Sequence, residues 1–185
     1  MFQYIKYTLF HFWVIMNIGF LLMGGIWPIV GFLAAMNFII FADTVFGDDK
    51  SEPEYKNPRI LIYLIWTLLP MSFLMLMTGM WLVLPGDLLN IGQTIYSLTG
   101  YDALAAKESV TLIGDIFAII TTGFIVGTIS GPAAHELVHR SEDKMSMLIG
   151  RWMLAFTCDS NFMIEHVYGH HVYVSTPKDP ATAPR

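Results

Sequence analysis

Four long apolar stretches dominate the pattern of the chain, and shorter polar segments separate them. Each stretch is long enough to cross the hydrocarbon core of a bilayer, which takes about 20 residues in a helix. The predicted spans are about 9–27, 28–46, 60–84 and 111–134. Period-two alternation typical of strands is weak. We therefore expect an all-α fold, a helical bundle that forms a single membrane domain over residues 1–185.

The segments between the spans have distinct characters. Two glycines and Pro28 predict a turn between the first two spans, because proline removes a backbone donor. Residues 47–59 are charged and proline-containing, so they predict a solvated loop. Residues 87–109 are mixed, and we expect a loop with one interfacial helix. Residues 145–158 are apolar but short and include an arginine, which predicts a helix along the membrane surface.

Composition narrows the function classes. The chain is 55% hydrophobic and 14% charged, with a net charge of −5, and it has no basic run for binding nucleic acid. Its single cysteine, Cys158, excludes an internal disulfide and an iron–sulfur cluster held by this chain alone. Glycine-rich nucleotide-binding loops are missing from the sequence. Any redox chemistry would therefore need electrons from a partner protein.

The distribution of basic residues predicts the orientation in the membrane. With four spans, the two ends of the chain and the 47–59 loop lie on one side, together with nine of the ten Lys and Arg residues. Only Lys107 lies on the other side. Because basic residues accumulate on the cytoplasmic side, we expect a cytoplasmic N-terminus and cytoplasmic histidines. The nine residues are Lys6, Lys50, Lys56, Arg59, Arg140, Lys144, Arg151, Lys178 and Arg185.

Five of the six histidines follow the fourth span, within residues 135–185. His135 and His139 are four residues apart, as are His166 and His170, so on an α-helix each pair shares one face. On the same helix His171 would be rotated by about 100° from His170. Five imidazoles exceed what a four-coordinate zinc site takes from a protein. The number indicates two metals, and iron suits nitrogen-rich oxygen chemistry.

Two carboxylates adjoin these histidines. Glu136 and Glu165 are candidates either to accept the second N–H of a metal-bound imidazole or to bind iron themselves. Three aspartates are further candidates for the first of these roles: Asp115, Asp159 and Asp179.

Other polar and small residues have simpler interpretations. His11 stands alone near the start of an apolar stretch, and we expect it at the membrane interface. Gly123, Gly127 and Gly131 recur at every fourth position, which usually allows close helix packing. The alternative is that these glycines open a channel for a narrow apolar substrate.

The histidine segments resemble a known family. HELVHR at 135–140 and EHVYGHHVYVSTPKDPATAPR at 165–185 resemble the first two histidine boxes of membrane-bound alkane 1-monooxygenases, within the membrane fatty acid desaturase and hydroxylase superfamily. The Thr-Pro-Lys-Asp-Pro-Ala continuation, residues 176–181, is similar to that of alkane hydroxylases in particular. FADTVFGDD at 41–49 also resembles the region that follows their second helix.

The resemblance implies a function and a location. It implies a non-haem centre of two irons, with His135, His139, His166, His170 and His171 as ligands. The expected reaction uses O2 to hydroxylate the terminal methyl of an n-alkane, with electrons from a rubredoxin or ferredoxin and its reductase, in the bacterial inner membrane. The family has about six transmembrane helices and further histidines beyond the second box. The resemblance therefore implies that this chain is an N-terminal fragment, incomplete at its C-terminus.

Other functions stay open at this stage. The sequence His135-Glu136-Leu137-Val138-His139 also fits the His-Glu-x-x-His pattern of zinc metalloproteases, with Glu136 as general base. Within the superfamily, a fatty acid desaturase or a xylene-type methyl hydroxylase would share the iron-binding boxes. A third possibility is a membrane-inserted fragment that binds metal without catalysis.

Overall fold

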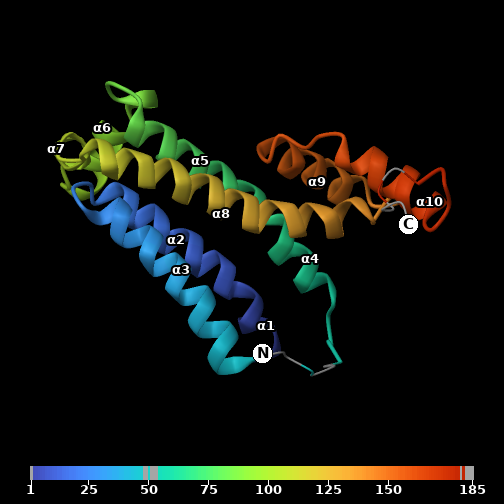
Figure 1. Ribbon diagram of the computed structural model, residues 1–185. Helices are drawn as coiled ribbons and strands as arrows, with labels where there is room; N and C mark the ends of the chain where they lie inside the picture. The colour runs from blue at the N-terminus through green and yellow to red at the C-terminus, as the bar shows by residue number, and fades with distance from the viewer. Residues whose placement is uncertain (1, 48–49, 51–53, 180, 182–185) are drawn as a thin grey trace.

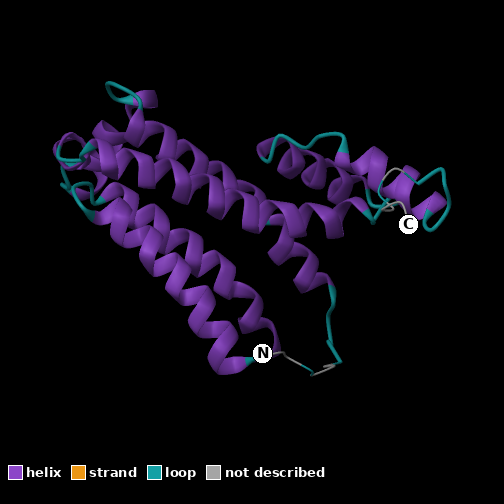
Figure 2. Ribbon diagram, viewed as in Figure 1, coloured by secondary structure: helices purple, strands orange, loops and turns teal. Residues whose placement is uncertain are grey.

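The computed structural model describes residues 2–47, 50, 54–179 and 181. This part of the chain is almost entirely helical and contains no strand (Figure 2). The helices form an elongated bundle around one central helix, with a smaller helical lobe beside its C-terminal half (Figure 1). The predicted all-α class is therefore confirmed.

The N-terminal part forms a helical hairpin, but its turn comes earlier than the sequence predicts. The first helix ends at Leu22 and the next begins at Trp27, so Pro28 lies in a helical first turn, where a missing N–H costs nothing. The turn is made by Gly24 and Gly25, which both have positive φ. Its elements are α1 (Phe2–Ile5), η1 (Lys6–Thr8), α2 (Leu9–Leu22) and α3 (Trp27–Phe46).

The predicted span at 60–84 is helical but divided into α4 (Arg59–Trp66) and α5 (Leu68–Val83). Pro70 explains the break, because it cannot donate to the carbonyl of Trp66 and its ring crowds that carbonyl. Thr67 lies between the two helices. Its hydroxyl donates to Leu64 O at 2.8 Å and therefore accepts from His11 Nε2 at 2.7 Å. His11 is thus a structural contact at the helix break.

The segment after α5 holds more helix than the single interfacial helix we expect from the sequence. It contains η2 (Leu88–Asn90), α6 (Ile91–Thr99) and α7 (Ala103–Glu108). These elements lie at the same end of the bundle as the α2–α3 turn (Figure 1). The Asp102 side chain accepts from Ala105 N and caps α7, a local signal that the mixed composition of this segment obscures.

A group of polar contacts, which we call the far-end lock, closes this end of the bundle. Lys107 Nζ donates to the carbonyls of Trp81, Leu84 and Gly86 at 2.5 to 2.6 Å, and so caps the C-terminus of α5. Asp87 accepts from Trp81 Nε1 at 2.7 Å and from two backbone N–H groups, those of residues 92 and 93. Each charged group of the lock therefore has polar partners.

The central helix is α8 (Leu112–Val138), which packs against α3, α5 and α9 (Lys144–Phe156). It extends beyond the predicted span at 111–134 and includes the first histidine segment as far as Val138. The predicted short helix at 145–158 exists as α9, and it lies close against α8. A Cβ on Gly150 would stand 3.0 Å from Leu137 Cβ, so the glycine permits this approach.

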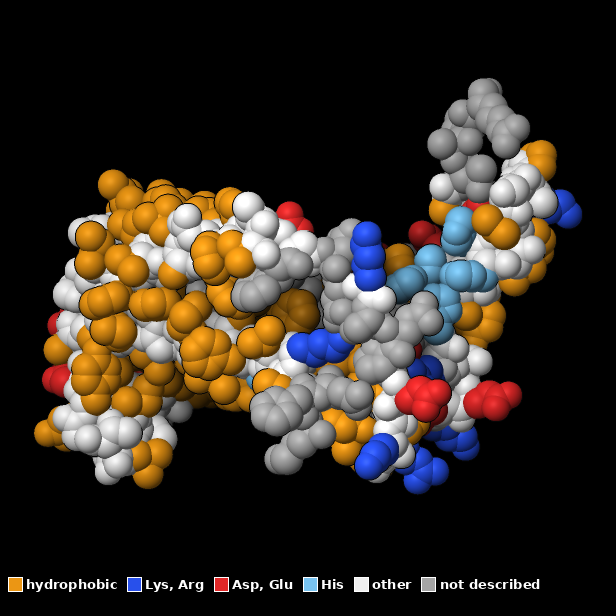
Figure 3. All heavy atoms as spheres, turned by 90° about the horizontal axis from the view of Figure 1, so that it is seen from below, with side chains coloured by type: hydrophobic (Ala, Val, Ile, Leu, Met, Phe, Trp, Pro, Cys, Tyr) orange, Lys and Arg blue, Asp and Glu red, His pale blue; other side chains and the backbone are white. Residues whose placement is uncertain are grey.

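Among the residues that the structure describes, three helices are long and apolar enough to cross a membrane: Trp27–Val45, Arg59–Val83 and Leu112–Val138. The apolar helix Lys6–Leu22 is shorter, so the predicted number of four spans stays a prediction. Phe12, Leu33 and Ile119 are each more than half exposed, as lipid-facing side chains are. Figure 3 shows hydrophobic side chains over most of one part of the molecule and charged and histidine side chains gathered at the other.

Candidate metal centre

Two helical segments carry the histidines to one place. His135 lies in the last turn of α8, and His139 follows as its C-terminal cap residue. The second segment is η3 (Ile164–His170), a π-helix, followed by α10 (His171–Tyr173). His171 N–H donates to His166 O, five residues earlier. The α-helical spacing that we predict for the second segment is therefore wrong, because a π-turn brings residues i and i+5 together.

Four imidazoles form what we call the histidine cluster: His135, His139, His166 and His171. Their Nε2 atoms form a chain of short approaches. His135 Nε2 lies 2.7 Å from His166 Nε2 and 3.2 Å from His139 Nε2, and His171 Nε2 lies 3.1 Å from His166 Nε2. Selected nitrogens of His135, His139 and His166 all lie within 4.8 Å of one another. Residues 31 positions apart in the chain thus converge on one point.

Hydrogen bonding alone cannot satisfy this arrangement. Each Nε2 of a neutral imidazole has one in-plane site, which is either an N–H or a lone pair. The Nε2 atoms of His135 and His166 each face two other nitrogens. The three contacts would need six donor or acceptor sites, but the four Nε2 atoms offer only four. Two ligands on one metal, each about 2.1 Å from it, stand about 3 Å apart when they are adjacent. The donor set therefore fits a metal ion that replaces the competing protons.

The surroundings of His166 favour the neutral form of its ring. Burial lowers the pKa of His166, and the neighbouring His135, His171, His139 and His170 lower it further. A neutral imidazole keeps the lone pair that a metal requires. The lowered pKa of His166 thus favours the form of this ring that binds a cation.

An aromatic side chain that sequence reasoning missed supports the cluster. Phe162 stacks on His166 with ring centroids 4.6 Å apart and an interplanar angle of 17°. Its ring also contacts His135 at a centroid distance of 5.8 Å. The sequence did contain a sign of this contact, because Phe162 lies four residues before His166 and residues at that spacing are neighbours on a helix.

His170 stands apart from the other four. Its ring is 5.5 Å from that of His166 and 5.4 Å from that of His171, measured between centroids. Its Nδ1 lies 2.9 Å from Asp179 Oδ2, and the Asp179 side chain is fully buried. Of the three aspartates singled out in the sequence, Asp179 is the one that contacts a histidine.

The two predicted glutamates do not join the cluster. Glu136 accepts from Arg140 at 2.6 Å, as an ion pair one turn apart, and both side chains line an apolar pocket beside α4. Glu165 is exposed, with no contact to the cluster among the described residues. Because a zinc protease needs its glutamate beside the metal-bound water, the geometry does not favour that alternative.

The other two aspartates lie elsewhere. Asp115 is in the first turn of α8, near Lys107 at the opposite end of the bundle. Asp159 is exposed in the turn that follows α9. Neither carboxylate therefore serves the histidines in this structure.

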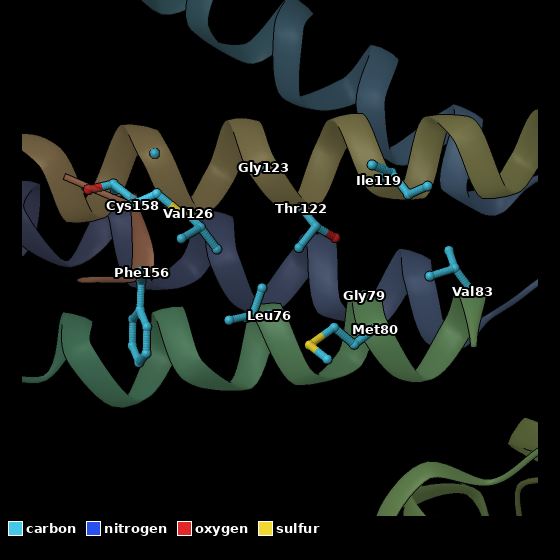
Figure 4. A pocket seen from close by; sticks show the side chains of 12 residues that line it. Leu76, Gly79, Met80, Val83, Ile119, Thr122, Gly123, Val126, Phe156 and Cys158 are labelled. Carbon is cyan, nitrogen blue, oxygen red and sulfur yellow. The ribbon is translucent and has the colours of Figure 1, made fainter. Parts of the chain in front are cut away.

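An apolar pocket of about 440 Å³ lies between α5 and α8 and reaches the end of α9. In Figure 4, Leu76 and Met80 of α5 and Val126 of α8 point toward one another across it. Gly123 and Gly127 line the same pocket. A Cβ on either would meet nothing within 4 Å, and the same holds for Gly131. The glycines therefore border open space, and the close packing we expect there is not found.

Several bacterial alkane 1-monooxygenases are similar in sequence to this chain. Alkane 1-monooxygenase 2 of Pseudomonas aeruginosa is 28% identical over 159 residues, which cover 85% of this chain and 38% of that protein. Alkane 1-monooxygenase 1 of the same organism is 29% identical, covering 76% of this chain and 33% of that protein. The alkane 1-monooxygenase of Ectopseudomonas oleovorans is 30% identical, with corresponding shares of 76% and 31%.

These alignments span only about a third of the relatives' length. No protein-family model matches the chain, and no solved structure does. The similarity nevertheless agrees with the long apolar helices and with the histidines that α8 and η3 bring together. The chain is therefore an alkane 1-monooxygenase-like integral membrane protein.

Proposed function

We propose that this chain supplies part of the metal centre of a membrane alkane hydroxylase. The reaction would insert one oxygen atom from O2 into the terminal methyl of an n-alkane, with electrons from a rubredoxin or ferredoxin and its reductase. The observation that carries the proposal is the convergence of four Nε2 atoms in a chain similar to alkane 1-monooxygenases.

The metal in this proposal is non-haem iron, with two irons in the complete centre. Imidazole is a suitable iron ligand, and the cluster offers more nitrogens than one metal with an open position requires. The residues that would hold the metals are His135, His139, His166, His170 and His171. When bound, iron would supply the activation of O2, which amino acid side chains cannot perform. The chain's own contribution is to hold imidazoles from the end of α8 and from the η3–α10 segment close to one another.

The pocket between α5 and α8 supports an apolar substrate. Ile119, Gly123 and Gly127 line it, and they lie on one row of α8 at four-residue spacing. The same row continues through Gly131 to His135, so the distance along the helix from Gly123 to His135 is about 18 Å at 1.5 Å per residue. We propose that an alkyl chain lies beside this row with its terminal methyl toward the histidines.

The orientation also belongs to the proposal. Lys107 lies at the end of the bundle with α6 and α7, away from the histidines (Figure 1). Arg140, Lys144 and Arg151 lie in or beside the segments that carry the cluster. We therefore propose that the histidine end faces the cytoplasm, in the inner membrane of a bacterium.

A chimera would test the proposed function. This chain would replace the matching segment of alkane 1-monooxygenase 2 of Pseudomonas aeruginosa, in a host that lacks other alkane hydroxylases. Cells with the chimera should convert n-alkanes to 1-alcohols, measured by gas chromatography. The same chimera with His135→Ala should be inactive at equal expression.

The controls decide between outcomes. A chimera of this relative with an unrelated four-helix membrane segment should produce no alcohol. If the chimera with this chain inserts at normal levels and binds iron but oxidises no alkane, the hydroxylase assignment is wrong.

A further inference from the structure

The three histidines of the second segment differ in their surroundings because of the π-turn. His166 and His171 face the cluster, because the backbone bond between them spans five residues. His170 is turned toward the loop that follows α10. Its Nδ1 lies 2.9 Å from Asp179 Oδ2, and the His170 side chain is 28% exposed.

The loop is built to return Asp179 to this position. Ser175 has a φ of 62°, which reverses the chain after α10. Thr176 N–H donates to Tyr173 O, and Asp179 N–H donates to Thr176 O, so the loop consists of consecutive tight turns. Asp179 is 6% exposed, and its Oδ1 accepts from Ala181 N at 3.0 Å. Both carboxylate oxygens are therefore fixed, one by the backbone and one by the imidazole.

We propose that Asp179 is a positioning residue that fixes the tautomer and ring direction of His170 for metal binding through Nε2. A carboxylate accepts hydrogen bonds, so Nδ1 carries the proton and Nε2 keeps its lone pair. The inference rests on the proposed metal centre, which it deepens. Within the described part of the chain, His170 thus has a carboxylate partner and the four histidines of the cluster have none.

The physical reason lies in the π-turn itself. An imidazole that is rotated away from the other four would otherwise be free to choose either tautomer and several rotamers. The buried carboxylate removes that freedom and makes the ring a stronger donor to a cation. Without Asp179, the cluster of four should still bind metal, but His170 should no longer contribute.

Metal titration of the full 185-residue chain in detergent would test this assignment. Co²⁺ is the probe, because its visible spectrum reports the number of nitrogen ligands, and a competing chelator gives the affinity. Asp179→Asn should weaken the contribution of His170, with a loss of about 10- to 100-fold in affinity at the affected position. It should also change the Co²⁺ spectrum. Asp159→Asn, at an exposed aspartate near the same segment, should change the affinity less than twofold.

A double-mutant cycle separates positioning from general stability. If Asp179 acts through His170, Asp179→Asn should have no further effect on affinity in a His170→Ala background. Equal losses in both backgrounds, or an unchanged affinity and spectrum for Asp179→Asn alone, would overturn the inference. Failure of the unmodified chain to bind Co²⁺ would instead refute the metal centre itself. Circular dichroism should show equal helix content in all variants.

Discussion

The two ends of the bundle treat polar groups in opposite ways. At the far-end lock, Lys107 has three carbonyl partners and Asp87 has three N–H partners, so donors and acceptors match. At the histidine cluster, His135 and His166 each face two nitrogens with only one site to offer. The lock is complete as a protein structure, whereas the cluster becomes satisfied only with a cation.

This difference distinguishes stabilising polar contacts from functional ones. Both groups join segments that are distant in sequence, and they lie at opposite ends of the bundle (Figure 1). A matched set of hydrogen bonds lowers the free energy of the folded chain directly. A mismatched set of ligand atoms lowers it only when the ligand binds. Substitutions at the two ends should therefore affect different measurements.

The largest effect is expected for His166→Ala. His166 contacts both His135 and His171, so its removal divides the cluster. Metal affinity should fall by more than about 100-fold, because losing a ligand exceeds the usual cost of losing an outer hydrogen-bond partner. The metal-free chain should keep its melting temperature within a few degrees. Isothermal titration with Co²⁺ and thermal melts would measure the two quantities, and a large loss of apo stability would contradict the comparison.

Lys107→Met should have the reverse profile. Three carbonyls at the end of α5 would lose their charged donor, which should lower the free energy of unfolding by about 2 kcal/mol. Metal affinity should stay unchanged, because the substitution is at the other end of the bundle. Lys144→Met, at an exposed lysine, is the control and should change stability by less than about 0.5 kcal/mol. Denaturant titration in detergent would show whether the lock contributes as expected.

A pair of glycine substitutions on α8 and α9 should give a smaller effect. A Cβ on Gly150 would stand 3.0 Å from Leu137 Cβ and 3.1 Å from Val138 Cγ1, so Gly150→Ala should cost about 1 kcal/mol. Gly123→Ala meets nothing within 4 Å and should be neutral or stabilising by about 0.5 kcal/mol. Because α9 leads into the second histidine segment, only Gly150→Ala should also weaken Co²⁺ binding.

Acidification should destabilise the histidine cluster and the far-end lock at different pH values. Of the effects predicted here, we expect this one to be the smallest. The pKa of His166 is lowered from 6.5, so its neutral form stabilises the folded chain above about pH 6.5, and this contribution is lost as the pH falls through the lowered value. Burial raises the pKa of Asp87, but N–H groups of Gln93, Gly92 and Trp81 and the charge of Lys107 bring it below 3.8. The lock should therefore hold to a lower pH than the histidine cluster does.

Hydrogen exchange on peptides from each end would measure this order. Exchange of the metal-free chain, corrected for the intrinsic effect of pH, should rise first around residues 135–171 and only later around residues 81–107. The opposite order would show that the cluster is not the end that depends on neutral rings.

Much of the fold follows from composition and local rules. Apolar length predicts α3 and α8, and the polar loops fall where charge accumulates. The breaks were harder to place, because they depend on single contacts. Pro70 divides a span whose hydropathy is continuous. Of the three residues that we expect at the α2–α3 turn, Gly24 and Gly25 form it and Pro28 lies in the first turn of α3. The position of a helix break depends on which backbone carbonyl or neighbouring side chain a residue contacts. Hydropathy does not contain that information.

The site shows the same limit more clearly. Residue type and spacing identify all five histidines, and the structure brings four of them together. The four-residue spacing predicts that His166 and His170 share one helix face, but this prediction holds only for an α-helix. In the π-turn, His171 is the residue that meets His166. The carboxylate that contacts His170 comes from nine residues later, through a loop with positive φ at Ser175. Of the two glutamates next to histidines, Glu136 pairs with Arg140 instead.

The π-turn at Ile164–His170 makes the ligand set sensitive to chain length as well as to residue identity. A π-turn is equivalent to one residue inserted into an α-helix. Deleting Gly169 would place His171 four residues after His166, where an ordinary α-helix stacks the two rings, so these two histidines would stay together. A one-residue insertion at the same place would instead put His171 six residues after His166, a spacing that neither an α-turn nor a π-turn brings together, while every histidine stays in the sequence. Insertions in this segment deserve the same scrutiny as substitutions of the ligands.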